Sequence, residues 1–418
     1  MKILRINSIS GPQGGVESYI NNITDRLDAL GNKTLSITLS SVGDPNFGPN
    51  NIVLQTSPNT VSRTFHDIIT DYSLFSKLSR IHEEFNPDLI HIHHFRIGFR
   101  SIYKFLMSVD TPVVFTAHDA LAVCPLSTLV KPGNEICEGG VALRCGFTGC
   151  KIHSHLPYEL MLSKSFKSLS RKRIKAFICP SYSIMRYLMS NGFSPVVHLP
   201  SFSSFEGYAT GKTPNYSEIL SRKTIGYIGR LEWYKGVDDL IRGFAIFAKT
   251  NRDYRLTIAG EGPFETNLKR LAESLGINSK VSWLGQIRRE QKEEFYNEIV
   301  CNVVPSKYWE NFALSAQESM LRGIPTIGTE IGGIPEIVQN LRTGFTVSIS
   351  SPQEISRALQ AITENKNDEV LEIMKSGHKF VLNNLTPEKN VMGLLDVYEK
   401  VLSGIPLTNG YDENNFLT

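Results

Sequence analysis

Two glutamates, Glu310 and Glu318, flank the expected start of a helix. A predicted strand ends near Pro305, and the helix is expected to begin near Phe312. Glu310 then lies in the loop before the helix, and Glu318 lies two turns into it. A helix N-terminus has free N–H groups and a partial positive charge that suit a phosphate, and carboxylates accept hydrogen bonds from sugar hydroxyls. The segment could hold a sugar and a ribose around an anion; the alternative is a helix-terminal acid and a solvated glutamate.

A pair of cations, Arg230 and Lys235, lies in the segment GRLEWYKG (229–236), directly after another predicted strand. Paired cations suit a diphosphate, and Gly236 allows a close approach of the backbone. Two solvated charges in a turn are the alternative interpretation.

Gly14 and Gly15 precede a predicted helix near the N-terminus. Backbone N–H groups at such a position could reach a phosphate or a developing charge. The glycine pair matches neither the dinucleotide fingerprint nor the phosphate-loop motif, and an ordinary tight turn is the alternative.

His118 follows a predicted strand and is itself followed by Asp119. A histidine at this position could hydrogen-bond a substrate hydroxyl or transfer a proton; a structural histidine is the alternative. The nearby His91, His93 and His94 are expected to line the core or a cleft wall.

Four of the six cysteines fall close together, with the spacing C-x12-C-x7-C-x4-C, in a glycine-rich segment with little helix or strand signal. Four thiolates could hold a structural zinc ion or an iron–sulfur cluster. The spacing contains no C-x2-C pair, so free or oxidisable thiols are the alternative. The residues are Cys124, Cys137, Cys145 and Cys150.

A basic stretch, residues 162–177, carries lysines and arginines but no acid, interleaved with apolar residues. Such a stretch could lie on an anionic membrane surface, and an exposed basic helix is the alternative. Its cations are Lys164, Lys167, Arg171, Lys172, Arg173 and Lys175.

The elements that must position these residues alternate between buried strands and amphipathic helices. This alternation predicts parallel sheets with helices on both faces, and a Pro-, Ser- and Gly-rich linker interrupts the series between residues 195 and 222. We expect two Rossmann-like, doubly wound domains, 1–205 and 222–386, facing across a cleft, because parallel sheets bind ligands at the carboxyl ends of their strands. A last amphipathic helix is expected at 387–402.

Bulk composition narrows the class of protein. A chain of 418 residues with a net charge of +3 gives no reason to expect nucleic acid as a partner. The sequence has no apolar run of about 18 residues and no signal-peptide core at its start. We therefore expect a cytoplasmic protein with reduced thiols.

In combination, these motifs resemble those of glycosyltransferase family 4, the retaining transferases of GT-B fold, over nearly the whole chain. The motifs occur in the family's order. They are Gly14–Gly15, His118–Asp119, GR-x4-KG at 229–236, GEGP at 260–263, E-x7-E at Glu310 and Glu318, and GG-x2-E at Gly332, Gly333 and Glu336.

The resemblance implies a role for each motif. Arg230 and Lys235 should bind the donor diphosphate, Glu318 the ribose, and Glu310 the transferred sugar, while His118 should contact a sugar hydroxyl. Further donor contacts are implied at Gly14, Gly15, Gly285, Gln286, Ile287, Phe312, Ala313 and Leu314. The helix 387–402 should cross back onto the first domain. Two departures stand out: Ala313 replaces a common glycine, and Ala120 replaces a common aromatic residue after the His118–Asp119 motif.

The predicted function is retaining transfer of a hexose-type sugar from a UDP-, GDP- or ADP-linked donor to a saccharide or lipid-linked saccharide. Surface polysaccharide or lipopolysaccharide synthesis, peripheral to the inner face of the cytoplasmic membrane, is the expected setting. No cofactor is expected for catalysis, because Arg230 and Lys235 supply the positive charge. The alternatives are a GT-B sugar-nucleotide epimerase and a non-catalytic nucleotide-sugar binding protein.

Overall fold

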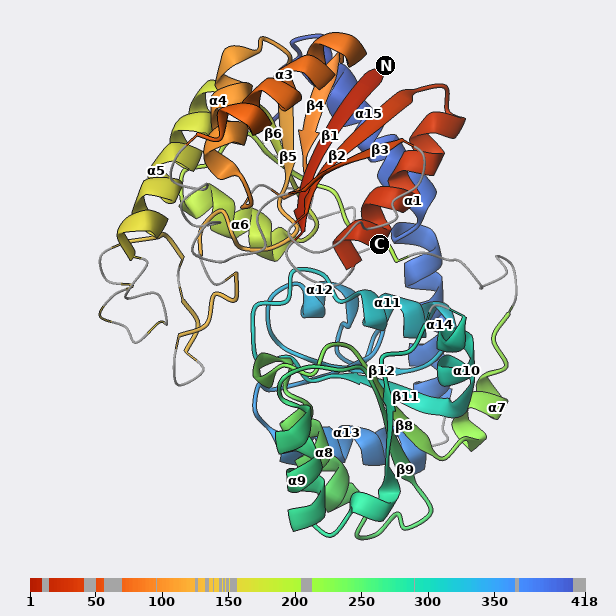
Figure 1. Cartoon of the computed structure of the whole chain (residues 1–418). Coiled ribbons are helices and arrows are strands. Elements are labelled where there is room, and N and C mark those ends of the chain that lie inside the picture. Colours follow the sequence, from red (N-terminus) through yellow and green to blue (C-terminus); the bar gives the residue numbers. More distant parts are fainter. Residues whose placement is uncertain are drawn as a thin grey trace. The chain divides into compact units, whose positions relative to one another are not determined.

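The chain folds into two α/β units in a computed structural model (Figure 1). One unit comprises Met1–Ser204 and Pro387–Thr418, and the other comprises Phe205–Thr386. No helix among the described residues is both long and apolar enough to cross a membrane. The described residues are 1–9, 15–40, 50–55, 70–94, 96–124, 127–131, 135–137, 139–142, 145, 147, 150, 156–203, 213–288, 290–364 and 368–408.

The first unit is built on a seven-stranded parallel sheet in the order β3-β2-β1-β4-β5-β6-β7. Its strand order reverses between β1 and β4, the two neighbouring strands at its centre. The strands are β1 (Lys2–Ile9), β2 (Lys33–Ser40), β3 (Asn51–Gln55), β4 (Leu89–Ile92), β5 (Val113–Thr116), β6 (Ile174–Cys179) and β7 (Val196–His198).

Helices cover both faces of this sheet. Figure 1 shows α1 and α15 side by side on one face, with α3, α4 and α5 on the other. The last helix completes the unit's core: Leu394 and Tyr398 of α15 are fully buried with Ile23 and Leu27 of α1. The helices are α1 (Gly15–Ala29), α3 (Tyr72–Phe85), α4 (Phe99–Ser108), α5 (Leu156–Lys172), α6 (Tyr182–Ser190) and α15 (Pro387–Leu402).

The second unit contains a six-stranded parallel sheet in the order β10-β9-β8-β11-β12-β13. The order reverses between β8 and β11, so the loops that follow these two strands emerge side by side. The strands are β8 (Thr224–Ile228), β9 (Arg255–Ala259), β10 (Val281–Gly285), β11 (Ile299–Val304), β12 (Thr326–Thr329) and β13 (Phe345–Val347).

Helices also pack on both faces of the second sheet, with α8 against α13 and α11 against α14. They are α7 (Tyr216–Ser221), η3 (Trp233–Lys235), α8 (Val237–Phe247), α9 (Glu265–Ser274), η4 (Asn278–Lys280), α10 (Gln291–Glu298), α11 (Leu314–Leu321), α12 (Ile334–Ile337), α13 (Pro352–Glu364) and α14 (Asp368–Asn384). The predicted fold class, two parallel-sheet α/β domains, is confirmed.

Candidate active site

Lys235 and Glu310 meet at the carboxyl ends of β8 and β11. The Lys235 ammonium donates to both carboxylate oxygens of Glu310 at 3.0 Å and to the hydroxyl of Tyr308 at 2.9 Å. Ser306 donates to the same carboxylate at 2.9 Å. The structure therefore joins two sequence-predicted residues into one hydrogen-bonded cluster, with Tyr308 and Ser306 as members that the motifs did not single out.

A glycine allows this cluster to form. Gly236 follows Lys235 with φ +70°, and a Cβ there would lie 1.8 Å from the carbonyl oxygen of Pro305 at the end of β11. Only glycine combines that backbone angle with so close an approach. The close approach predicted for the Gly236 backbone is therefore made to the carbonyl group at the end of β11.

The cluster is largely shielded from water. The side chains of Lys235 and Glu310 are 19% and 13% exposed. Burial is the largest single influence and would lower the pKa of Lys235, but the Glu310 carboxylate together with Tyr308 and Tyr227 raises the pKa above the ordinary lysine value. Lys235 is consequently a permanent cation over the physiological pH range.

Arg230 does not join this cluster. Its side chain is 67% exposed and pairs with Glu232 at 3.1 Å, while its carbonyl oxygen accepts a hydrogen bond from Tyr227 at 2.9 Å. The backbone of the loop is therefore held in place, and the guanidinium reaches into solvent.

Glu318 lies in α11, which begins at Leu314 rather than near Phe312, so this residue is about one turn into the helix instead of two. Its carboxylate accepts hydrogen bonds from Lys292 at 2.8 Å and from Tyr296 at 2.8 Å. Both partners belong to α10, and the sequence motifs did not identify them. These two hydrogen bonds fix the position of the buried Glu318 carboxylate.

The GG-x2-E motif packs against the backbone of Glu310. The amide of Gly333 donates to the Glu310 carbonyl oxygen at 2.7 Å, and a Cβ on Gly332, at φ +60°, would lie 2.2 Å from that oxygen. This motif holds the Glu310 loop, a positioning role that the sequence did not reveal.

The predicted base-contacting segment, Gly285 to Ile287, is tied to the GEGP loop. The amide of Gln286 donates to the Glu261 carboxylate at 3.2 Å, and the Gly260 amide donates to the Gly285 carbonyl oxygen at 2.7 Å. Ile287 packs on the core of the unit. Of the other predicted donor contacts in this unit, Ala313 is buried, and Phe312 and Leu314 are partly buried around the start of α11.

In the first unit, His118 follows β5 and contacts His93. The Nδ1 atom of His93 and the Nε2 atom of His118 lie 3.0 Å apart in a hydrogen bond, with the rings stacked. Burial, with a smaller contribution from His94, lowers the pKa of His118 to about 3. A neutral imidazole suits hydrogen bonding to a hydroxyl better than proton donation at neutral pH.

The other histidines are held by the fold. His91 is fully buried between the hydroxyls of Tyr398, at 2.6 Å, and Thr116, at 2.7 Å. His94 bonds the hydroxyl of Ser8 at 2.7 Å. Gly14 lies outside the described residues, and Gly15 is the first residue of α1.

The four clustered cysteines are partly exposed and form no disulfide in the described part of the chain. Within the described residues, which include all four, no group of three or more histidine, cysteine, aspartate or glutamate side chains is placed to hold a metal ion. The described residues therefore offer no metal site that corresponds to the predicted zinc or iron–sulfur centre.

The basic stretch forms most of α5 and the start of β6. The α5 face bearing Leu162, Phe166 and Leu169 is buried. Arg173 departs from the predicted basic face, because its guanidinium donates to the carbonyl oxygens of Val109 and Thr111. The exposed cations are Lys164, Arg171, Lys172 and Lys175.

Comparisons with known proteins match both units. Residues 13–201 match a model described as Glycosyltransferase Family 4, and residues 214–379 match one described as Glycosyl transferases group 1. The two matched ranges follow one another along the chain, one in each unit.

Two curated relatives illustrate the sequence similarity. An uncharacterized glycosyltransferase of Bacillus subtilis (strain 168) is 26% identical over 254 residues, which cover 61% of this chain and 68% of the relative. The N-acetyl-alpha-D-glucosaminyl L-malate synthase of Bacillus anthracis is 30% identical over 45% of this chain, and the match spans about half of that relative (48%).

Two solved structures illustrate the fold. Sucrose-phosphate synthase from Thermosynechococcus elongatus has a TM-score of 0.73 at 17% identity, covering 97% of this chain and 100% of that one. Anabaena Alr3699/HepE in complex with UDP-glucose has a TM-score of 0.70 at 16% identity, covering 96% and 100%.

Proposed function

Because this chain belongs to glycosyltransferase family 4 and has the GT-B fold, we propose that it moves a hexose-type sugar from a nucleotide-sugar donor to a hydroxyl group of a saccharide or lipid-linked saccharide. The observation that carries the proposal is the shielded cluster of Lys235, Tyr308 and Glu310. It puts a permanent cation beside a carboxylate where the strand order reverses, and open α/β sheets bind ligands at such a point.

In the proposed reaction, Lys235 and Arg230 bind the donor diphosphate and stabilise the negative charge that grows on it as its bond to the sugar breaks. Glu310 and Tyr308 already hold the Lys235 ammonium in place. Little side-chain freedom is therefore lost when the phosphate binds. Arg230, which is exposed, turns from Glu232 toward the diphosphate.

We propose transfer with retention of configuration. The acceptor hydroxyl attacks the anomeric carbon on the face from which the diphosphate departs. The new C–O bond forms as the bond to phosphate breaks, and the hydroxyl proton passes to the departing diphosphate. Glu310 accepts hydrogen bonds from the transferred sugar, and neutral His118 bonds one of its hydroxyls. The two cations make a divalent metal unnecessary for this step.

The nucleotide is recognised by the segments around β10 and α11. Glu318, held by Lys292 and Tyr296, is proposed to bind the ribose hydroxyls. Backbone amides at the start of α11 are proposed to face phosphate, and the loop at Gln286 to lie near the base. The similarity to Alr3699/HepE, whose structure is in complex with UDP-glucose, makes that compound the first donor to test.

The acceptor is proposed to be lipid-linked and presented at an anionic membrane, in surface polysaccharide synthesis. The exposed cations of α5, among them Lys164, Arg171 and Lys172, support this proposal. Flotation with anionic liposomes at low salt tests it. A protein that stays at the bottom of the gradient has no such affinity.

A thermal-shift panel of UDP-, GDP- and ADP-sugars tests the donor, since a ligand that binds only the folded state raises its melting temperature. The stabilising nucleotide sugar is then incubated with and without candidate acceptors. Glycosylated product that depends on acceptor supports the transferase. An epimer formed from donor alone indicates an epimerase instead, and tight binding with no turnover indicates a binding protein.

A further inference from the structure

On β1, β2 and β3, part of one face of the first unit's sheet is polar where a parallel sheet is normally apolar. Arg5 of β1 is in register with Ser36 of β2, which is in register with Asn51 of β3, and the next row pairs Asn7 with Thr38. Alternate positions on the same strands carry buried apolar residues such as Leu4, Ile6 and Leu39. A run of polar side chains across three neighbouring parallel strands needs partners that the apolar core does not offer.

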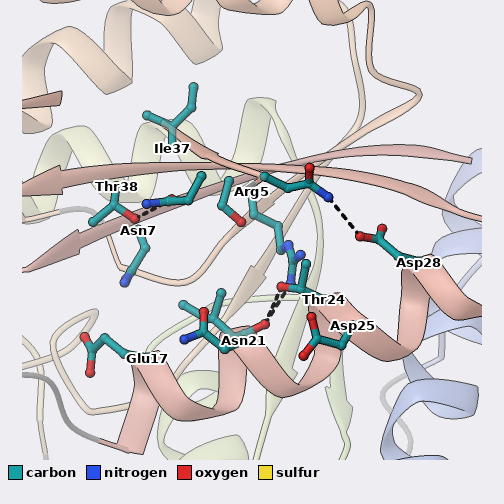
Figure 2. Close-up of a pocket in the computed structure, with 13 residues that line it drawn as sticks. Arg5, Asn7, Glu17, Asn21, Thr24, Asp25, Asp28, Ile37 and Thr38 are labelled. Carbon is teal, nitrogen blue, oxygen red and sulfur yellow. Dashed lines mark hydrogen bonds between the residues drawn. The ribbon is translucent and has the colours of Figure 1, made fainter. Parts of the chain in front are cut away.

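These side chains line a cavity of about 400 Å³ between the strands and α1 (Figure 2). Figure 2 shows Arg5 reaching from β1 toward α1 at the centre of the lining residues. The helix contributes a polar stripe that faces the strands. Its residues are Glu17, Asn21, Thr24, Asp25 and Asp28.

Three side chains that line this cavity, Arg5, Asn7 and Asn51, have buried polar atoms without a hydrogen-bond partner in the described part of the chain, and for Asn51 this atom is Nδ2. Arg5 is 1% exposed and donates from Nη1 to the carbonyl oxygen of Ile20 at 3.1 Å, but its Nε and Nη2 have no hydrogen-bond partner within the described part of the chain. The Oδ1 atom of Asn7, a residue 5% exposed, is likewise unpartnered there. A buried polar group left unpaired costs about 1–3 kcal/mol, and more when it is charged. These atoms would be satisfied by a guest that offers acceptors to Arg5 and to the Asn51 amide and a donor to Asn7.

The charges around the cavity decide which guest fits. Arg5 lies within the electrostatic reach of Asp25 and Asp28. Asp28 is itself fixed by Thr34, at 2.8 Å, and Asn50, at 3.1 Å. Because these carboxylates and that of Glu17 outnumber the one guanidinium of the lining, the cavity does not suit an anion. The unpartnered N–H groups of Arg5 and the unpartnered oxygen of Asn7 instead suit a guest whose groups both accept and donate hydrogen bonds.

We propose that this cavity binds a monosaccharide or a single sugar unit of a glycan. A sugar hydroxyl accepts from guanidinium and amide N–H groups while donating to a carboxylate or amide oxygen, and the lining supplies both kinds of partner in neighbouring positions. The volume falls in the range of small-molecule sites. The site is separate from His118, and its occupancy does not depend on the transfer chemistry proposed for Lys235.

Isothermal titration of the full chain with free neutral hexoses and N-acetylhexosamines tests the proposal, with a uronic acid and an amino acid as comparators. Asn21→Phe places a bulky ring in the cavity from a half-exposed helix position and should abolish sugar binding. Ser18→Ala, on the exposed side of α1, is the matched control. Arg5→Gln removes the charged fork and should weaken binding about 10-fold or more, provided circular dichroism shows that it folds.

His118→Ala separates the two sites, because it should leave binding in the cavity unchanged. The proposal is overturned if no neutral sugar binds the wild-type chain, if only the uronic acid or the amino acid binds, or if Asn21→Phe binds as the wild type does. Loss of binding in His118→Ala alone would assign the sugar to the proposed transfer site instead. A chain that binds sugar in the cavity but lacks transferase activity would refute the proposed function and leave this inference intact.

Discussion

Replacing Lys235 with alanine separates a catalytic role of the Lys235–Glu310 pair from a purely structural one. The substitution removes the cation that we propose to stabilise the departing diphosphate. Deleting one such electrostatic partner in an active site typically slows turnover by about 100-fold or more. It also leaves the Glu310 carboxylate, 13% exposed, without its counter-ion, which should lower the free energy of unfolding by about 3–5 kcal/mol.

Stability and catalysis must therefore be measured separately. Lys307 offers the matched control, since it forms a similarly shielded ion pair with Asp238 and Asp239, at 2.8 and 2.9 Å. Lys307→Ala should lose comparable stability but keep near wild-type turnover per folded molecule.

The assay is turnover of the donor identified by thermal shift, at a temperature where circular dichroism shows both variants folded. Equal turnover by the Lys235→Ala variant and the wild type would refute the assignment of Lys235 to the diphosphate. An equal loss in the Lys307→Ala variant would show that the defect arises from destabilisation.

Three further predictions concern single residues and pH. Gly236→Ala should lower the melting temperature by at least about 5 °C. An alanine in the left-handed conformation costs about 1–2 kcal/mol, and its Cβ would collide with the Pro305 carbonyl. An unchanged melting temperature in calorimetry would contradict the close approach of this glycine to the end of β11. Glu318→Ala should weaken UDP or donor binding in titration calorimetry by about 10-fold or more with a smaller effect on the rate at saturation; unaltered affinity would remove Glu318 from the nucleotide site. The folded-state pKa of His118, about 3, lies below its unfolded value, so the unfolded chain binds the proton first and stability should fall as pH drops below about 6.5, by up to about 1.4 kcal/mol per pH unit for this residue. His118→Asn should make the pH dependence of the free energy of unfolding, measured by urea denaturation, less steep between pH 7 and 5, and an identical slope would show that folding does not lower the pKa of His118.

The alternation of strands and helices was visible in the sequence because each strand of a parallel sheet is a buried apolar run. The cation pair and the glutamates could be placed for the same reason, since each follows such a run. The start of α11 was misplaced by two residues, as Phe312 and Ala313 continue the apolar pattern without being helical.

Side-chain partners were harder to foresee than backbone elements. The bonds from Lys292 and Tyr296 to Glu318 join α10 to α11, and no local spacing rule links residues on separate helices. Arg173 was interpreted as one more surface cation, although its guanidinium donates a hydrogen bond to the carbonyl oxygen of Thr111, far away in the sequence. The alternation of Arg5 and Asn7 with apolar residues in KILRINSI did not suggest a polar cavity, because the strands of a parallel sheet are expected to be apolar throughout.

The return of α15 to the first unit has a consequence for synthesis on the ribosome. Buried residues of that unit's core, such as Leu394 and Tyr398, are translated only after the whole of the second unit, which is one continuous segment, Phe205–Thr386. The usual order, in which the N-terminal domain folds first during translation, is therefore reversed in this chain. Until α15 has been made, the apolar residues that it covers in the finished fold, such as Ile23 and Leu27 of α1, lack that part of their core, and we expect the first unit to be the more aggregation-prone of the two during this interval.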